Sequence, residues 1–139
     1  VGVASTQWGF GMRGVRDVEE ERTLFLIGGV HFLADLLDAF AEAAQGPDAD
    51  LTEVARCDVA FHMAIAAASG GTLLPRMLGE LNEVLSESRR ATLSRRGQMS
   101  ASAKQHQAIV DGLESGKPQA AEKAILSHLD STGSLLMQG

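Results

Sequence analysis

The sequence is poor in cysteine and in long apolar runs, and each shortage narrows the class of protein. Its single cysteine, Cys57, cannot form an intramolecular disulfide and is typical of a reducing compartment. No apolar run reaches the roughly 18–20 residues of a membrane-spanning helix. No basic segment precedes an apolar block as it does in a signal peptide. We therefore expect a cytoplasmic protein with no membrane partner.

Positive charge is also scarce. The chain has 12 Lys and Arg against 18 Asp and Glu, which gives a net charge of −6. An acidic domain is a poor candidate for holding nucleic acid by itself, because binding phosphates requires clustered Lys and Arg. The length of 139 residues, 45% of them hydrophobic, suits one soluble domain with a sizeable core.

Two regions differ in pattern. Residues 1–16 are rich in glycine, show no periodicity, and are predicted to be a linker or tail, whereas residues 17–139 are predicted to form one helical domain. Gly9, Gly11 and Gly14 do spell a dinucleotide-binding fingerprint. Such a fingerprint needs a buried strand before it and parallel strands after it, and neither is present, so we reject that interpretation.

Apolar residues recur at helical spacing through most of the domain, and no segment alternates as a strand does, so we predict an all-α fold. Segment 17–45 is interpreted either as one helix weakened by Gly28 and Gly29, or as two helices that meet there. Four further helices are expected at about 51–68, from a Thr72 cap to Arg96, at 101–114, and at 118–136.

Four polar side chains lie on the apolar faces of three of these helices. Asp58 and His62 are four residues apart and project together, and His106 and His128 occupy apolar faces of later helices. Burying a lone polar group costs roughly 2–7 kcal/mol, so something must compensate for them. For any one histidine alone, a core residue with a single hydrogen-bond partner is the better interpretation. The joint pattern favours a divalent metal, with zinc first and nickel or manganese as alternatives.

These residues belong to a longer motif that resembles the FCD domain, the C-terminal effector-binding domain of FadR-subfamily GntR-type transcription regulators. The resemblance covers about residues 50–132 well and residues 17–45 poorly. One departure is Gly71, where the family commonly has asparagine. The motif consists of Asp58-x-x-x-His62, Ala66-Ala67-Ala68-Ser69-Gly70, Gln105-His106-x-x-Ile109, a glycine-containing turn at 115–118, Ala120-Ala121 and His128-Leu129.

The resemblance implies an antiparallel bundle of about six helices. In it Asp58, His62, His106 and His128 would bind a divalent metal at the floor of a pocket, and the metal would help to hold a small organic acid. The family also implies a homodimer. DNA would be bound only through a winged helix-turn-helix domain that precedes residue 1.

Two arginines are candidates for contact with the effector anion. Arg22 is the nearest match to an arginine that the family carries in its first helix, and Arg89 continues the apolar face of the helix that Thr72 caps. The alternative for both is a solvated surface arginine, because arginines are mostly exposed.

The best interpretation is a ligand-sensing and dimerisation domain rather than an enzyme. The effector would shift the population between two arrangements of the helices. The alternative is a metal-dependent hydrolase or lyase that uses a metal-bound water. It would need a general base near the open metal position, whereas Glu53 and Glu80 are predicted on polar faces. In a third alternative the histidines only form hydrogen bonds.

Overall fold

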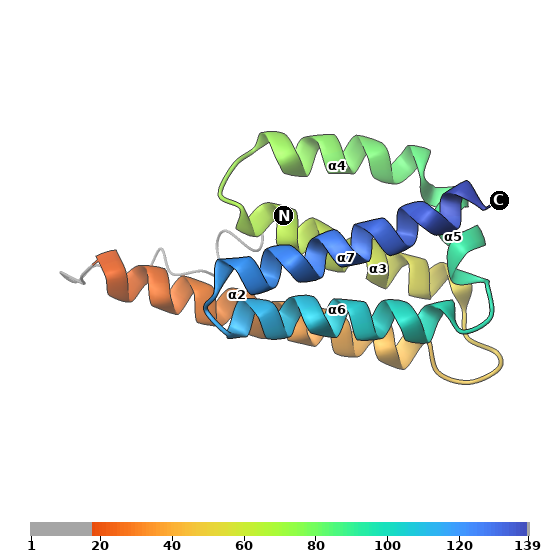
Figure 1. Cartoon of the computed structure of the whole chain (residues 1–139), viewed down its shortest axis with the longest axis horizontal. Helices are drawn as coiled ribbons and strands as arrows, with labels where there is room; N and C mark the ends of the chain where they lie inside the picture. Colours follow the sequence, from red (N-terminus) through yellow and green to blue (C-terminus); the bar gives the residue numbers. More distant parts are fainter. Residues whose placement is uncertain (1–17, 139) are drawn as a thin grey trace.

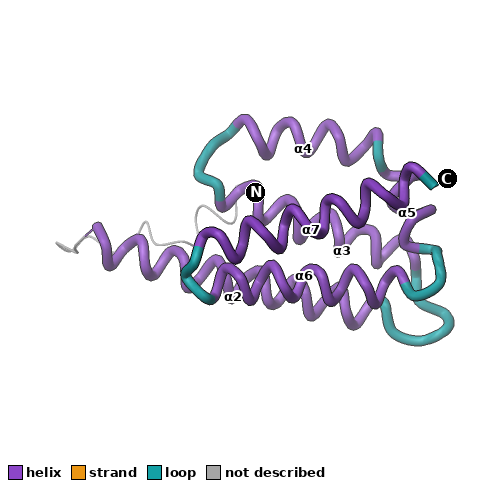
Figure 2. The backbone as a smooth tube through the Cα atoms, in the orientation of Figure 1, coloured by secondary structure: helices purple, strands orange, loops and turns teal. Residues whose placement is uncertain are grey.

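The computed structural model describes residues 18–138, and the side chains from residue 28 onward, as a set of six α-helices (Figures 1 and 2). No strand occurs in this part of the chain, which confirms the all-α prediction. Residues 1–16, predicted to be a linker or tail, lie outside the described residues, as does the side chain of Arg22. The helices are α2 (Val18–Ala43), α3 (Leu51–Ala68), α4 (Leu73–Val84), α5 (Ser86–Leu93), α6 (Gln98–Glu114) and α7 (Pro118–Met137).

The long helices α2, α3, α6 and α7 form an antiparallel bundle (Figure 1). Helix α2 packs against both α3 and α6, and α6 packs against α7 over most of its length. Helix α4 contacts only α3 and α5 among the described helices, so it lies at the margin of the bundle (Figure 2).

Local signals explain where α3 begins and ends. The side chain of Asp50 caps α3 by accepting a hydrogen bond from the backbone N–H of Thr52 at 2.9 Å. After the helix, Gly70 has a φ of +79°, a left-handed conformation that glycine adopts without a steric penalty. The predicted range of 51–68 is therefore confirmed.

The segment around Gly28 and Gly29 is part of one continuous helix, which decides between the two interpretations of residues 17–45. The prediction of a single helix from the Thr72 cap to Arg96 is wrong, because the chain bends at Leu85 between α4 and α5. Helix α4 has no buried residue, whereas α5 buries Thr92 and Leu93. The bend turns α5 into the bundle, and this burial is its physical reason.

Helix α6 starts earlier than predicted, at Gln98 instead of Ala101. Gly97 precedes it with a φ of +78° and marks the break that its sequence position indicates. Gln98 is buried and donates a hydrogen bond from its side-chain amide to Ser102 Oγ at 3.3 Å. This buried contact holds the first turn of α6 in place.

The apolar core consists of two clusters that meet beside α3. One cluster joins α2, α3 and α6, and the other joins α2 and α3 to the end of α5. Cys57 is buried in the second cluster, as expected of a small hydrophobic residue. The fully buried side chains include Phe40, Phe61, Ile109, Val54, Val110 and His106.

Helices α6 and α7 approach each other very closely near the turn that joins them. A Cβ added to Gly112 would lie only 2.9 Å from the backbone N and Cα of Ala121. Glycine at this position therefore allows the close packing of the two helices that bring His106 and His128 together.

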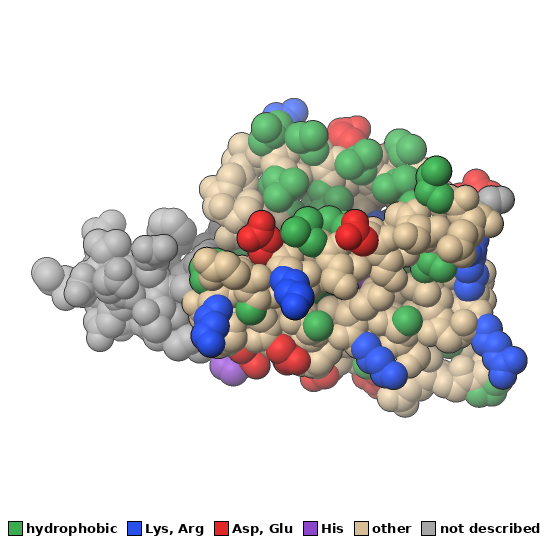
Figure 3. Space-filling view, viewed as in Figure 1, with side chains coloured by type: hydrophobic (Ala, Val, Ile, Leu, Met, Phe, Trp, Pro, Cys, Tyr) green, Lys and Arg blue, Asp and Glu red, His purple; other side chains and the backbone are tan. Residues whose placement is uncertain are grey.

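One face of the molecule is strongly apolar. Figure 3 shows hydrophobic side chains gathered over α4 and beside it on α7. Five large residues of α4 are between 48% and 77% exposed, namely Leu73, Leu74, Met77, Leu81 and Val84. None of the described helices is both long and apolar enough to cross a membrane.

Candidate metal centre

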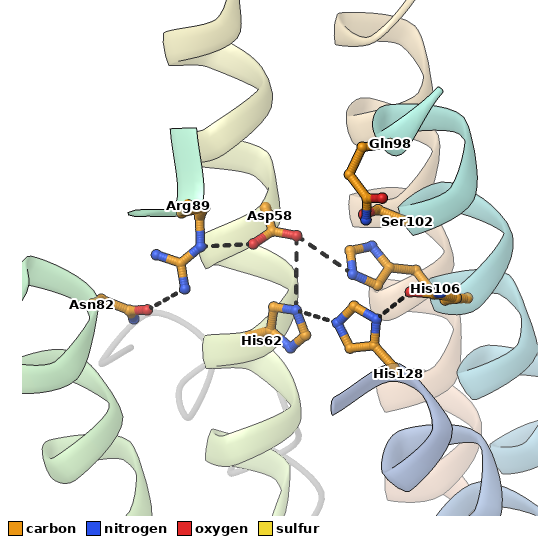
Figure 4. A network of polar contacts seen from close by, with 9 residues as sticks. Asp58, His62, Asn82, Arg89, Gln98, Ser102, His106 and His128 are labelled. Atoms are coloured by element: carbon orange, nitrogen blue, oxygen red, sulfur yellow. Dashed lines mark hydrogen bonds and ion pairs between the residues drawn. The ribbon is translucent and has the colours of Figure 1, made fainter. Parts of the chain in front are cut away.

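The four polar residues singled out in the sequence meet inside the bundle (Figure 4). Helix α3 provides Asp58 and His62, α6 provides His106, and α7 provides His128. Asp58 Oδ1 lies 3.7 Å from His62 Nε2 and 3.4 Å from His106 Nε2. His128 Nε2 lies 3.3 Å from His62 Nε2. Three helices thus direct one carboxylate and three imidazoles to a common point.

These separations have the size that a metal requires. Each of the three histidines has a ring nitrogen within 4.8 Å of the corresponding nitrogens of the other two. Two nitrogen ligands of a tetrahedral zinc ion are about 3.4 Å apart, given zinc–nitrogen distances of about 2.0–2.1 Å. The three histidines could therefore hold a metal after small rotations of their rings.

His106 has the most unusual surroundings of the four. Its side chain is fully buried, stacked on Phe61 with ring centroids 4.4 Å apart and placed edge-on to Phe40 at 5.2 Å. Neither ring nitrogen has a hydrogen-bond partner among the described residues, since the contact with Asp58 has the distance of an ion pair but not the geometry of a hydrogen bond. A buried polar group without a partner costs about 1–3 kcal/mol. A metal bound at Nε2 would give this ring the partner that the protein does not supply.

Burial also keeps the imidazoles in the protonation state that binds metal. Removal from water lowers the pKa of His62 and of His128 to about 4, and that of His106 to about 2. The positive charge of Arg89 also lowers the pKa of His62, and protonation of His62 or His128 would lower the pKa of His106 further. All three rings are therefore neutral near pH 7, with lone pairs available for a metal.

The pKa of Asp58 is shifted upward. Burial of the carboxyl group raises it, and the positive charge of Arg89 acts in the opposite direction. A divalent ion would favour the ionised carboxylate further, as nearby positive charge does.

Arg89 is not a solvated surface residue, and its side chain is only 15% exposed. Its Nε donates a hydrogen bond to Asp58 Oδ2 at 2.8 Å, and its Nη2 donates to Asn82 Oδ1 at 3.0 Å (Figure 4). Its third nitrogen, Nη1, is buried and has no hydrogen-bond partner in the part of the chain that the structure describes. Arg89 thus places an unused cationic donor next to Asp58.

Two residues that support this cluster were not predicted from the sequence. Asn82 accepts the hydrogen bond from Arg89, but the two residues lie on different helices on either side of the bend at Leu85, so helical spacing does not indicate their contact. Gln105 was noted only as part of a motif, yet its amide oxygen lies 2.8 Å from His128 Nδ1. Its position directly before His106 does not by itself indicate that contact.

Comparison with known proteins places the chain in one family. The family model of the FCD domain matches residues 29–131, a range that contains every residue of the cluster. Comparisons with curated proteins and with solved structures gave no significant match. The chain therefore belongs to the FCD domain family, whose members are the C-terminal effector-binding domains of GntR-type transcription regulators.

Proposed function

We propose that this effector-binding domain senses a small organic acid through a divalent metal held by Asp58, His62, His106 and His128. The observation that carries the proposal is the convergence of the three histidines, with Asp58 beside His106. The buried ring nitrogens of His106 have no hydrogen-bond partner among the described residues. One oxygen and three nitrogen ligands suit zinc best, with nickel or manganese as alternatives. When bound, the metal would supply a Lewis acid able to accept an effector oxygen in addition to the four protein ligands.

The effector is inferred to be a carboxylate because a cationic donor lies beside the cluster. Arg89 Nη1 is buried and unpaired, while Nε of the same side chain holds Asp58. A carboxylate suits this donor, because arginine and carboxylate form strong charge-assisted hydrogen bonds. Arg22 remains a second candidate contact on the basis of sequence alone.

Arg89 also provides a path by which effector binding could alter the bundle. It belongs to α5, and its two hydrogen bonds reach α3 at Asp58 and α4 at Asn82. An effector that engages Arg89 binds one arrangement of these three helices better than another, and this difference shifts the population. In a GntR-type regulator the shift would be passed to a winged helix-turn-helix domain, which is the part that binds DNA.

We further propose that the apolar face of α4 and α7 is the contact between two copies of this chain. Ten large apolar side chains there, about half exposed on average, present on the order of 500 Å² of apolar surface. A typical interface buries about 800 Å² on each partner, somewhat more than half of it apolar, so the size matches. The ten residues are Leu73, Leu74, Met77, Leu81, Val84, Leu85, Leu126, Leu129, Leu136 and Met137.

The dimer is tested by sedimentation of the wild type and of Leu81→Glu. Leu81 is 48% exposed, so a charge there should separate the copies without unfolding either one. Gln107→Glu, on the exposed side of α6, is the matched control and should remain a dimer. A wild-type monomer, or a Leu81→Glu dimer of unchanged stability, would reject this surface.

The sensor is favoured over a metal-dependent hydrolase or lyase because the cluster has no spare carboxylate. Asp58 is the one buried acid among the residues whose side chains are described, and its second oxygen is held by Arg89. Glu53 pairs with Arg56 at 2.6 Å on the surface, and Glu80 is exposed. A general base for a metal-bound water is therefore not provided by the residues around the cluster.

Two measurements, made one after the other, test the proposed function. Elemental analysis of purified protein, before and after chelation, should show one divalent ion per chain. Thermal unfolding of the metal-loaded protein with mono-, di- and hydroxycarboxylic acids should then show saturable stabilisation by at least one of them. Consumption of the acid would indicate an enzyme, and absence of bound metal would leave the histidines with a purely structural role.

A further inference from the structure

The contact between Gln105 and His128 joins two helices next to the metal centre. Gln105 lies on α6 and reaches across to α7, where its Oε1 is 2.8 Å from His128 Nδ1. Its Nε2 donates a hydrogen bond to Ser131 Oγ at 3.0 Å, one turn beyond His128 on the same helix. The other ring nitrogen of His128, Nε2, faces His62 Nε2 at 3.3 Å.

This contact bears on which nitrogen of His128 carries the proton. A neutral imidazole has one N–H, and its position is set by the hydrogen bond that each nitrogen makes. An amide oxygen can only accept, so Nδ1 must donate to Gln105 and Nε2 is left with a bare lone pair. If the amide were reversed, its NH₂ group would donate to Nδ1 and the proton would move to Nε2, where it would block metal binding.

We infer that Gln105 is a positioning residue that fixes the metal-binding tautomer of His128, through the amide oxygen that faces Nδ1. The role is that of the oxygen acceptors which commonly support metal-binding histidines. A neutral amide serves here without adding a second negative charge to the cluster that contains the buried Asp58. The inference rests on the proposed metal centre, but the tautomer can be measured without any metal.

The first readout is the tautomer of His128 in metal-free protein, from long-range ¹H–¹⁵N NMR of the imidazole nitrogens. The wild type should show Nδ1–H. Gln105→Met, which keeps the length but removes the acceptor, should shift the ring to a mixture or to Nε2–H. Gln107→Met is the matched control, because Gln107 lies on the exposed side of α6 and bonds only Asp111.

The second readout is zinc affinity, measured by competition with a coloured chelator. Gln105→Met should weaken binding about 10- to 100-fold, the range found when partners of metal-binding histidines are removed. Gln105→Glu should retain the wild-type affinity, because a carboxylate also accepts from Nδ1. The Gln107→Met control should bind zinc as the wild type does.

Gln105→Glu provides a test that does not depend on Gln105→Met folding. A carboxylate has no NH₂ group to present to the ring, so His128 should keep Nδ1–H in this variant.

Three results would overturn the inference: Nε2–H on His128 in the wild type, unchanged tautomer and zinc affinity in Gln105→Met, or loss of Nδ1–H from His128 in Gln105→Glu. Failure of the proposed function has a different signature. In that case the wild type binds no zinc, yet His128 still shows the Nδ1–H tautomer that depends on Gln105.

Discussion

Replacement of His106 by leucine should stabilise the metal-free domain and remove its response to metal. His106 is fully buried and neither of its ring nitrogens has a hydrogen-bond partner. Leucine removes this desolvation cost of about 1–3 kcal/mol and forfeits the stacking on Phe61, worth about 0.5–1.5 kcal/mol. Burial of leucine itself contributes about 1.5–3 kcal/mol, so these terms together raise the free energy of unfolding by about 1–5.5 kcal/mol.

In the presence of metal, His106→Leu should lose the stability that metal binding adds to the wild type. A metal at 100 times its Kd stabilises the wild type by about 2.7 kcal/mol, and this increment should be absent in His106→Leu. Urea unfolding followed by circular dichroism, with excess EDTA and then with zinc, measures both changes. His31→Leu is the control, because His31 is exposed on α2 and should change neither value.

The outcome that would refute this reasoning is a His106→Leu domain that is less stable without metal and still stabilised by zinc as the wild type is. His106 would then be held by contacts that stabilise the protein as they stand. The metal would have to be bound elsewhere.

Two further predictions concern packing and pH. Gly112→Ala should destabilise the domain by about 1–3 kcal/mol in urea unfolding, because its Cβ would lie 2.9 Å from the Ala121 backbone. Gly133→Ala in α7, with nothing within 4 Å of the new Cβ, should instead stabilise the domain by up to about 1 kcal/mol. Equal effects of the two substitutions on stability would contradict the close approach of α6 and α7 at Gly112. As pH falls from about 6.5 toward 4, the metal-free domain should lose stability, because unfolded histidines take up protons while the folded pKa values remain at about 4 or below. The raised pKa of Asp58 opposes this loss only in part. A melting temperature in EDTA that rises on acidification would therefore contradict the burial of the three rings.

The convergence of the four polar residues could be predicted because it depends on periodicity alone. Asp58 and His62 share a face through their four-residue spacing, and His106 and His128 replace apolar residues on faces that must point inward. A polar group at a core position of one helix indicates that others must compensate for it. The structure places all four in contact distance, as that reasoning requires.

The bend at Leu85 could not be predicted because no local signal marks it. Neither glycine nor proline lies at the bend. Its cause is tertiary, since α5 turns inward to bury Leu93 and to bring Arg89 to Asp58. In the opposite sense, Gly28 and Gly29 carry a local signal for a break, yet α2 continues through both.

The partners of the cluster were also beyond sequence reasoning, because they depend on how one helix is placed along another. The hydrogen bond of Gln105 to His128 requires α6 and α7 to lie at one particular offset, which the close contact at Gly112 sets. That of Arg89 to Asn82 spans the bend, whose angle no periodicity specifies. Helical patterns determine which face a residue occupies, but not its neighbour on the next helix.

A buried cluster of this kind makes stability and ligand binding parts of one equilibrium. Without metal, the neutral rings and Asp58 are held in the interior at a cost, so the bundle gains stability when a ligand satisfies them. Helices α3, α6 and α7 supply the proposed metal ligands, whereas α4 and α5 are joined to the cluster through Arg89. On the proposed function, an effector anion that engages Arg89 therefore acts on the helix whose outer face is the proposed dimer contact. The position of Arg89 gives a physical reason why an effector bound at the centre of the bundle would alter the outer face of α4.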